Sequence, residues 1–437
     1  MKLKHSAGFA AAGVLAMALT ACSSGSDSGD DAAESGDGAI SGDITVLTNR
    51  TDLIDTTFQD YKNTFESEYP DVNVEFEGIT DYEGDVSIRL NTQDFGDVLL
   101  IPNTVSKDQL PNFFAPLGSV DEVSETYRFV SEQAYEDQAY GVAITGNAQG
   151  YVINKKVWEE AGITEAPTTP EEFVDALQAI ADSTDATPYY TNYADGWPLS
   201  QWQGNRGVMA GPETEQILAD TDEPWTEGEE QYAIDSLLYD VVDAGLSEDD
   251  PTTTNWEESK TLLGSGEVAT MVLGSWAVTQ VQDAAEAAGG SPDDIAYWPM
   301  PFQVDGSFHS TIGGDYKNAV SKYSENPEAA RAWVDWFAQE SGYAESQGGL
   351  APTVEGELPS TLSEFESLGV EFVEIDPAPA GEETALSDIY DTAEIDLWGN
   401  VYRQKMIDTA RGAADGDKAS YFDSLNERWS AARAEVG

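Results

Sequence analysis

Apolar positions along the first hundred residues follow two different periods, which separates predicted strands from a predicted helix. Residues 44–47 form a short apolar run typical of a strand. Aromatic residues then recur at helical spacing from 58 to 65, and apolar positions alternate from 72 to 76. The run at 98–101 suits a buried parallel strand. Strand, helix and strand in succession predict a βαβ unit and a parallel sheet.

Two extended segments are predicted at 142–145 and 151–154, separated by five residues that begin and end with glycine. Glycine permits the backbone changes that a hinge requires. We therefore place the first crossing between two domains at residues 146–150.

Helices dominate the remainder of the chain. Thr169 is a predicted N-cap, followed by Pro170 in the first turn and Glu172 at the capping-box position. Asn326 precedes a similar start. Further helices are predicted at about 231–244, 255–264 and 276–288 and around 421–429, with strands at 268–273 and 319–321.

The N-terminal residues read as a targeting segment. Basic residues precede an apolar run at 7–19, which is too short to span a bilayer, since a spanning helix needs about 20 residues. The sequence Leu19-Thr20-Ala21-Cys22 resembles the lipobox of bacterial lipoproteins, in which the cysteine is diacylated and becomes the first mature residue. The alternative is a chance free cysteine after an ordinary signal peptide. We expect residues 1–21 to be the signal peptide and 22–42, rich in Ser, Gly and Asp, to be a disordered tether.

The formal charge of −62, from 82 acidic and 20 basic residues, narrows the possible partners. Such a surface repels nucleic acid and anionic lipid and disfavours an anionic ligand. Solubility, or tolerance of salty surroundings, is the simplest explanation for the charge. The length of the chain favours two domains.

The sequence lacks the motifs that several kinds of metal and catalytic site require. Beyond the leader the only histidine is His309, and Cys22 is the only cysteine, so His and Cys cannot assemble a zinc set. The chain has neither a Gly-x-Ser-x-Gly elbow nor a phosphate-binding loop. We expect no catalytic residues, no metal and no cofactor.

What remains is a mixture of polar and aromatic residues in loops, which suits sugar recognition. A sugar presents hydroxyls at its edge and C–H patches on its faces, so amides and charged groups with aromatic rings can hold it. This mixture occurs at 48–52, 81–82, 195–197, 274–276 and 313–316.

At these loops the sequence resembles the carbohydrate-binding branch of the extracellular solute-binding proteins of ABC importers, often called family 1. The resemblance covers nearly all of residues 43–437. The matching pieces, in their shared order, are Tyr140-Gly141-Val142, residues 151–155, 158–163 and 167–173, residues 266–271, Gly274-Ser275-Trp276, Gly313-Gly314 and residues 326–330.

The resemblance implies an α/β fold of the two-lobe, periplasmic-binding-protein-like (type II) kind, with a hinge and an interdomain cleft. The expected lobes are 43–146 with about 307–345, and 147–306 with about 346–437. It further implies a monomer anchored by lipid to the extracellular face of the cell membrane, which closes around a sugar and docks on membrane permease subunits.

The resemblance also implies ligand-binding positions, each with an alternative reading. Relatives often carry an aromatic residue after the first strand, where this chain has Asn49 and Arg50. Arg50 could instead form an ion pair with Asp52, and Trp276 could be a core residue at a helix start. We assign Trp398 to the core. The expected ligand-binding residues are Asn49, Arg50, Asp81, Trp197, Trp202, Trp276, Gly314 and Asp315, of which Trp197 and Trp202 could equally be core.

The leading hypothesis is a sugar-binding component of an importer, which binds a mono- or oligosaccharide and is not an enzyme. A polyamine, amino-acid derivative or peptide is an alternative ligand that the acidic surface would suit. A surface glycoside hydrolase is a second alternative, although no paired-acid motif supports it.

Overall fold

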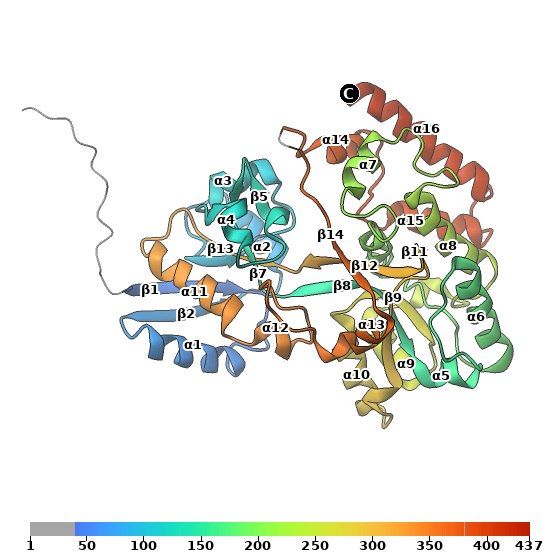
Figure 1. Ribbon diagram of the computed structural model, residues 1–437, viewed down its shortest axis with the longest axis horizontal. Helices are drawn as coiled ribbons and strands as arrows, with labels where there is room; N and C mark the ends of the chain where they lie inside the picture. The colour runs from blue at the N-terminus through green and yellow to red at the C-terminus, as the bar shows by residue number, and fades with distance from the viewer. Residues whose placement is uncertain (1–39, 380) are drawn as a thin grey trace, which may run out of the picture. The chain divides into compact units, whose positions relative to one another are not determined.

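The computed structural model describes residues 40–379 and 381–437 (Figure 1). The predicted signal peptide, Cys22 and most of the predicted tether lie outside the described residues. Residues 40–437 belong to one unit, which contains two sheet-based lobes. In the part of the chain that is described, no helix has the length and apolarity to cross a membrane.

The first lobe is built on a five-stranded sheet with the order β2-β1-β3-β13-β7. The predicted βαβ unit is confirmed, because β1 pairs in parallel with both β2 and β3. Strand β13 arrives from much later in the sequence and pairs antiparallel with β3 and β7. The elements are β1 (Gly42–Thr48), α1 (Thr57–Glu68), β2 (Val72–Gly78), α2 (Tyr82–Arg89), β3 (Val98–Leu100), η1 (Lys107–Gln109), α3 (Leu110–Phe113), β4 (Gly118–Ser119), α4 (Val120–Ser124), η2 (Val130–Gln133), β5 (Ala134–Tyr135), β6 (Gln138–Ala139), β7 (Val142–Ala143), β13 (Lys317–Val320), α11 (Pro327–Gln339) and α12 (Tyr343–Ser346).

Apolar faces of two helices close the core of this lobe. Phe58 and Phe65 of α1 are buried, as the helical spacing predicts. Trp333 and Phe337 of α11 are buried against the same core. Residues more than 250 positions apart therefore share one hydrophobic core, because α11 and β13 return to the first lobe.

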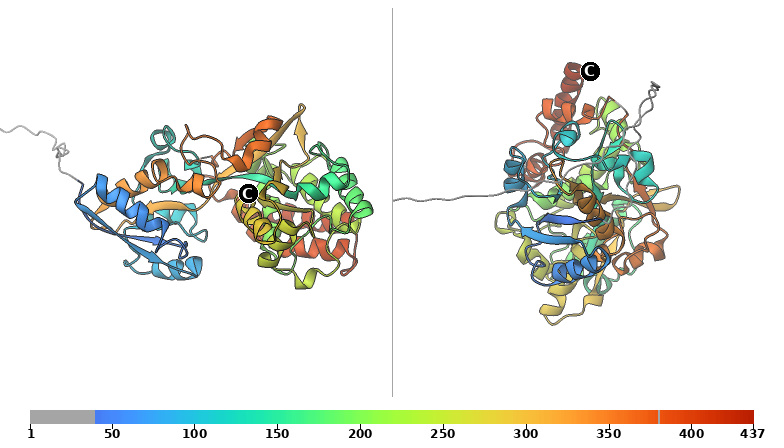
Figure 2. Two further views of the ribbon diagram at one scale, coloured as in Figure 1. Left: turned by 90° about the horizontal axis from the view of Figure 1, so that it is seen from below. Right: turned by 90° about the vertical axis from the view of Figure 1, so that its left-hand side faces the viewer.

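The second lobe contains the six-stranded sheet and the remaining helices (Figures 1 and 2). Strands β9, β10 and β12 all pair antiparallel with β8. The elements are β8 (Gly146–Asn154), α5 (Lys155–Glu160), α6 (Pro170–Ser183), η3 (Trp197–Asn205), α7 (Thr214–Asp220), α8 (Glu230–Asp243), η4 (Pro251–Thr253), α9 (Trp256–Ser265), β9 (Thr270–Gly274), α10 (Ala277–Ala287), η5 (Pro292–Asp294), β10 (Ile295–Trp298), β11 (Gln303–Val304), β12 (Ser307–Gly314), η6 (Ser360–Leu362), α13 (Ser363–Leu368), β14 (Glu371–Glu374), α14 (Ala385–Thr392), α15 (Val401–Ala410) and α16 (Lys418–Val436).

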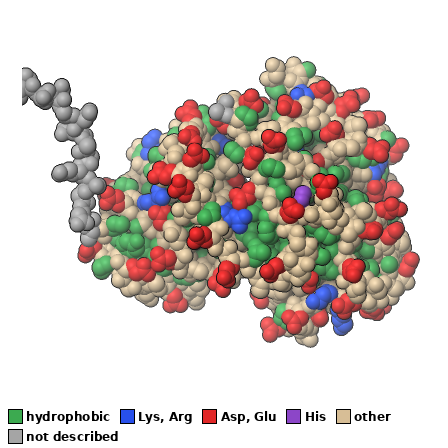
Figure 3. All heavy atoms as spheres, in the orientation of Figure 1, with side chains coloured by type: hydrophobic (Ala, Val, Ile, Leu, Met, Phe, Trp, Pro, Cys, Tyr) green, Lys and Arg blue, Asp and Glu red, His purple; other side chains and the backbone are tan. Residues whose placement is uncertain are grey.

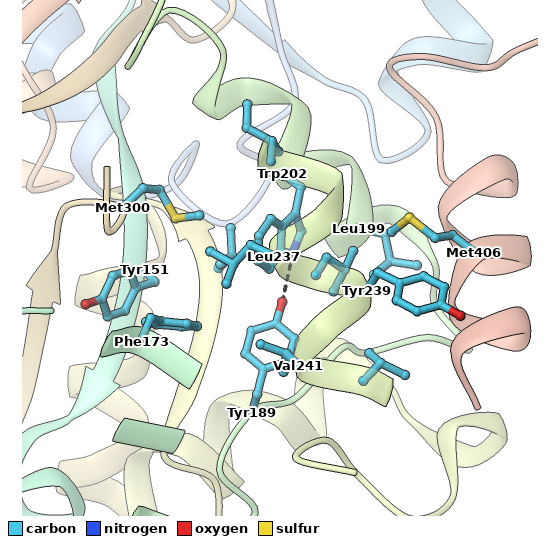
Figure 4. Packing of buried hydrophobic residues seen from close by; sticks show 14 of the residues in the cluster. Tyr151, Phe173, Tyr189, Leu199, Trp202, Leu237, Tyr239, Val241, Met300 and Met406 are labelled. Atoms are coloured by element: carbon cyan, nitrogen blue, oxygen red, sulfur yellow. Dashed lines mark hydrogen bonds between the residues drawn. The ribbon is translucent and has the colours of Figure 1, made fainter. Parts of the chain in front are cut away.

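Helix boundaries in this lobe follow the local sequence. The hydroxyl of Thr169 accepts a hydrogen bond from the amide of Glu172 at 3.2 Å, which confirms the predicted start of α6. Large apolar side chains from α6, α8, η3 and α15 fill the core around Trp202 (Figure 4). The indole of Trp202 donates to the hydroxyl of Tyr189 at 2.8 Å, so its one polar group is satisfied inside the core.

Residues 146–150 do not separate two extended segments as predicted, because they open the long strand β8. Glycine serves close packing here. A Cβ on Gly146 would lie 2.5 Å from the ring of Phe129, and one on Gly150 would lie 2.4 Å from the carbonyl oxygen of Trp298. The chain leaves the first lobe between β7 and β8 and returns between β12 and β13. A third passage follows α12, where Leu350 exchanges two backbone hydrogen bonds with Gly146.

Candidate functional site

A cavity of about 780 Å³ lies between the two lobes. Lys107, Ser131 and Glu132 line it from the first lobe. The second lobe supplies Gln149 and Gly204. Segments from β12, from α7, from α14 and the chain leading into it and from the end of α16, together with Trp398, complete its walls. Its volume falls in the upper part of the range, roughly 300–1,000 Å³, that is usual for small-molecule sites.

The floor of the cavity is formed where β8 and β12 pair near the first lobe. Asn147 lies opposite Gly313 in this antiparallel register, and Gly146 lies opposite Gly314. The side-chain carbonyl oxygens of Asn147 and Gln149 are buried and have no hydrogen-bond partner among the described residues. Of these two residues only Gln149 lines the cavity, and its buried oxygen would need a side-chain rotation to meet a ligand.

Three tryptophans of the second lobe form an aromatic cluster, which we define as Trp197, Trp256 and Trp276. Their ring centroids lie 5.5 to 5.8 Å apart. Trp197 is exposed and the other two are half-buried, so ring surface remains open to solvent. Open aromatic faces of this kind can stack against the C–H patches of a sugar.

The aromatic cluster and the cavity share helix η3 as a wall. The side-chain oxygen of Gln201 in η3 accepts a hydrogen bond from the indole of Trp276 at 3.4 Å. One turn later, Gly204 lies against the side chain of Gln149, where a Cβ would approach to 2.9 Å. Helix η3 therefore connects the cavity wall with the aromatic cluster, although none of the three tryptophans is among the residues that line the cavity.

Arg50 is held in a fixed position near the third passage between lobes. Its guanidinium makes two hydrogen bonds to the carboxylate of Asp52, at 2.9 and 2.8 Å, so the alternative reading as an ion pair is observed. It also donates to the hydroxyl of Tyr343 at 3.1 Å and to Gln347. The hydrogen bonds from Arg50 lower the pKa of Asp52. Burial raises the pKa of Tyr343, although the nearby Arg50 opposes this shift.

The remaining predicted residues have other local roles. Asp81 is exposed and caps α2, accepting from the amide of Gly84 at 3.4 Å. Asp315 accepts from the amide of Tyr316 at 2.8 Å. Trp202 is fully buried in the core of the second lobe. Asn49 borders a void of only about 20 Å³ inside the first lobe.

The structure thus distributes the predicted residues over several places. Trp197 and Trp276 come together in the aromatic cluster, and Gly314 follows the lining residue Gly313 at the end of β12. Within the described residues, none of the eight predicted positions lines the 780 Å³ cavity itself. Their roles in ligand binding remain predictions.

Sequence reasoning missed several residues that face the site. The assignment of Trp398 to the core is wrong, since this side chain is 50% exposed and lines the cavity. Its position directly before a Gly-Asn pair was the available signal, because that context suits a loop. Gln149 carried no such signal, because only the sheet register and the packing against η3 place it in the lining.

The cavity is more acidic than basic. Seven of its lining residues are Asp or Glu, whereas two are Lys or Arg. Acidic side chains are also scattered over the face of the molecule in Figure 3. An anionic ligand would meet an unfavourable field here, whereas a neutral or cationic ligand would not.

Comparisons with known proteins agree on one family. The family model described as bacterial extracellular solute-binding protein matches residues 51–344. A binding protein of an ABC transporter from Bifidobacterium animalis subsp. lactis, solved in complex with mannobiose, superposes with a TM-score of 0.81. It is 34% identical, over 91% of this chain and 95% of that chain. A manno-oligosaccharide-specific protein from the same organism, in complex with mannotriose, gives a TM-score of 0.81 and 33% identity over the same shares.

A more distant relative matches only part of the chain. The diacetylchitobiose binding protein DasA of Streptomyces coelicolor is 27% identical over 224 residues, which are 49% of this chain and 50% of the relative. The chain thus matches about half the length of this relative. The likeness to the solved binding proteins confirms the predicted α/β two-lobe fold.

Proposed function

Because the chain belongs to the family of bacterial extracellular solute-binding proteins, we propose that it captures a neutral mono- or oligosaccharide for an ABC importer. Membership of this family supports a location outside the cytoplasm. The ligand would occupy the cavity between the lobes and then be delivered to membrane permease subunits. The relatives with mannobiose and mannotriose make manno-oligosaccharides the first candidates.

The observation that carries this proposal is the cavity itself. Its lining includes the side-chain amides of Gln149 and Gln216 and the exposed indole of Trp398. Amides can bind hydroxyls, and indole rings can cover the faces of a sugar. Its volume exceeds what a single hexose requires, which supports a ligand of more than one unit. No group of three metal-ligating residues occurs among the residues described, and the related proteins are binding proteins.

Closure of the two lobes is thermodynamically coupled to binding of the ligand. A saccharide shifts the protein toward a closed form only by the difference between its affinities for the closed and open forms. Contacts to both lobes provide that difference, because only the closed form makes them all. The cavity lining includes side chains from both lobes, as this mechanism requires.

The experiment is titration calorimetry of the purified protein against mannobiose, mannotriose, diacetylchitobiose and a panel of monosaccharides. We expect saturable heat with at least one of these sugars. Heat only from spermidine, included in the same panel, would favour the polyamine alternative, which the seven acidic lining residues support. Absence of binding to every saccharide contradicts the proposal.

We also propose that Cys22 is acylated and anchors the protein to the outer face of the membrane. The lipobox sequence supports this proposal, and two acyl chains suffice for stable anchoring. Expressed in a bacterium with its own leader, the wild type should fractionate with membranes, and a Cys22→Ala variant should lose most of that association. Equal partition of the two proteins would contradict the anchor.

A further inference from the structure

Glu132, in η2 of the first lobe, carries a carboxylate that two elements of the crossing region hold in place. Its Oε1 atom accepts a hydrogen bond from the amide of Gly314 at 2.9 Å. Its Oε2 atom forms an ion pair with the ammonium of Lys317. Lys317 in turn donates to the carbonyl oxygen of Gly314 at 2.8 Å. The pair therefore binds both backbone groups of the residue at which β12 ends.

The two members of this pair differ in their access to the cavity. The side chain of Lys317 is 10% exposed, whereas that of Glu132 is 31% exposed and lines the cavity. Lys317 therefore lies behind the carboxylate. Its charge offsets part of the cost of holding a carboxylate at a partly buried position.

A glycine keeps the approach to this carboxylate open. A Cβ on Gly313 would lie 3.2 Å from Oε1 of Glu132, and no other residue lies nearer to that Cβ position. Asn147, opposite Gly313 in the register, is 8% exposed and its side-chain oxygen has no partner in the described part of the chain. The Glu132 carboxylate thus lies at an opening in the floor of the cavity, which the missing side chain of Gly313 leaves.

The chemistry of this opening favours a pair of hydroxyl groups. A carboxylate has about four acceptor positions, of which the Gly314 amide and the Lys317 ammonium occupy two. The other two can accept O–H donors, and hydrogen bonds to a charged acceptor are stronger than neutral ones. A second carboxylate would instead be repelled. The opening thus suits a sugar unit with two adjacent free hydroxyls and rejects a sugar acid.

We propose that Glu132 binds two adjacent hydroxyls of the saccharide at the floor of the cavity, and that Lys317 is the residue that positions it. This inference rests on the proposed function and adds a specificity-determining residue to it. Because the same carboxylate binds Gly314, a ligand at this opening contacts the segment through which the chain returns to the first lobe.

The test compares wild type, Glu132→Gln and Gly313→Ala for binding of mannobiose and mannotriose by calorimetry, with the melting temperature measured for each protein. Glu132→Gln should weaken binding about 10- to 100-fold, as expected for loss of hydrogen bonds to a charged acceptor. Gly313→Ala keeps the ion pair but narrows the opening, and should also weaken binding. The matched control is Glu125→Gln, which removes one exposed charge of the same lobe outside the cavity lining and should bind like wild type.

The role of Lys317 is tested with a double-mutant cycle. Lys317→Met should weaken binding, and combining it with Glu132→Gln should add little, because both changes disable the same carboxylate. Lys317→Arg should recover part of the affinity. Fully additive effects would show that Lys317 acts on binding by another route and would overturn its positioning role.

The outcomes separate this inference from the function on which it rests. If wild type binds a saccharide and a folded Glu132→Gln variant binds it equally well, the role of Glu132 is overturned while the proposed function stands. If Glu132→Gln does not fold, Gly313→Ala decides, and unchanged affinity in that variant overturns the inference. If wild type binds no saccharide, both proposals fail together.

Discussion

Two ion pairs in this protein show how differently charged residues behave inside a core and at the edge of a cavity. Arg403 and Asp235 are both fully buried in the second lobe, and Nε of the arginine lies 3.0 Å from the carboxylate. Lys317 and Glu132 form the other pair, in which the carboxylate is partly exposed and lines the cavity. The first pair is closed to solvent on every side, whereas the second is open on one side.

The surroundings of the core pair leave no position for a ligand. The carboxylate of Asp235 also accepts from the indole of Trp225 at 2.8 Å and from Gln231 at 2.9 Å. The guanidinium of Arg403 donates to Gln203 at 2.6 Å and lies over the ring of Tyr402. A saturated network of this kind holds α8, α15 and η3 together. The comparison teaches that unused acceptor positions, more than charge or burial, distinguish a recognition site from structural support.

The largest expected effect comes from breaking the core pair. Arg403→Met should lower the free energy of unfolding by about 3–5 kcal/mol, because it leaves Asp235 buried without its counter-ion. Chemical denaturation measures this change. Lys418→Met, which breaks the surface pair with Asp240, is the matched control and should cost at most about 1 kcal/mol. A similarly small loss of unfolding free energy in both variants would show that the buried pair matters no more to stability than the surface pair.

A smaller effect, on binding instead of stability, is expected from the aromatic cluster. Trp276→Ala should weaken saccharide binding by about 1–3 kcal/mol, because it removes ring surface that would stack on the ligand. Calorimetry measures the affinity, and Tyr323→Ala, which removes another exposed aromatic side chain, serves as the control. Unchanged affinity together with a large loss of thermal stability would assign Trp276 to the core.

Local sequence signals predicted the framework of the fold well, since they depend on short-range chemistry. The N-cap at Thr169 and the buried face of α1 follow directly from neighbouring residues. The strand that begins at Gly146 could not be predicted in this way, because a glycine in a sequence can indicate either a hinge or close packing. Its role became clear only when the ring of Phe129 was seen to occupy the space that a side chain would need.

The site was less predictable, because its residues converge from distant segments. Arg50 stood out as a rare basic residue, yet its hydrogen-bonding groups are engaged by Asp52, Tyr343 and Gln347. The pairing of Glu132 with Lys317 depends on where β13 returns to the first sheet, and no local pattern records that return. Composition indicated the type of ligand better than it identified the residues that would hold it.

The late arrival of β13 has a consequence for the newly made chain. Its partner β3 is synthesised long before residues 317–320 exist, so the sheet of the first lobe keeps an unpaired edge while the whole of β8 to β12 emerges. Unpaired edges invite pairing with other chains. Contacts between such distant segments also slow folding. A nascent or partly exported chain that ends before β13 would therefore carry an aggregation-prone edge until the sheet can be completed.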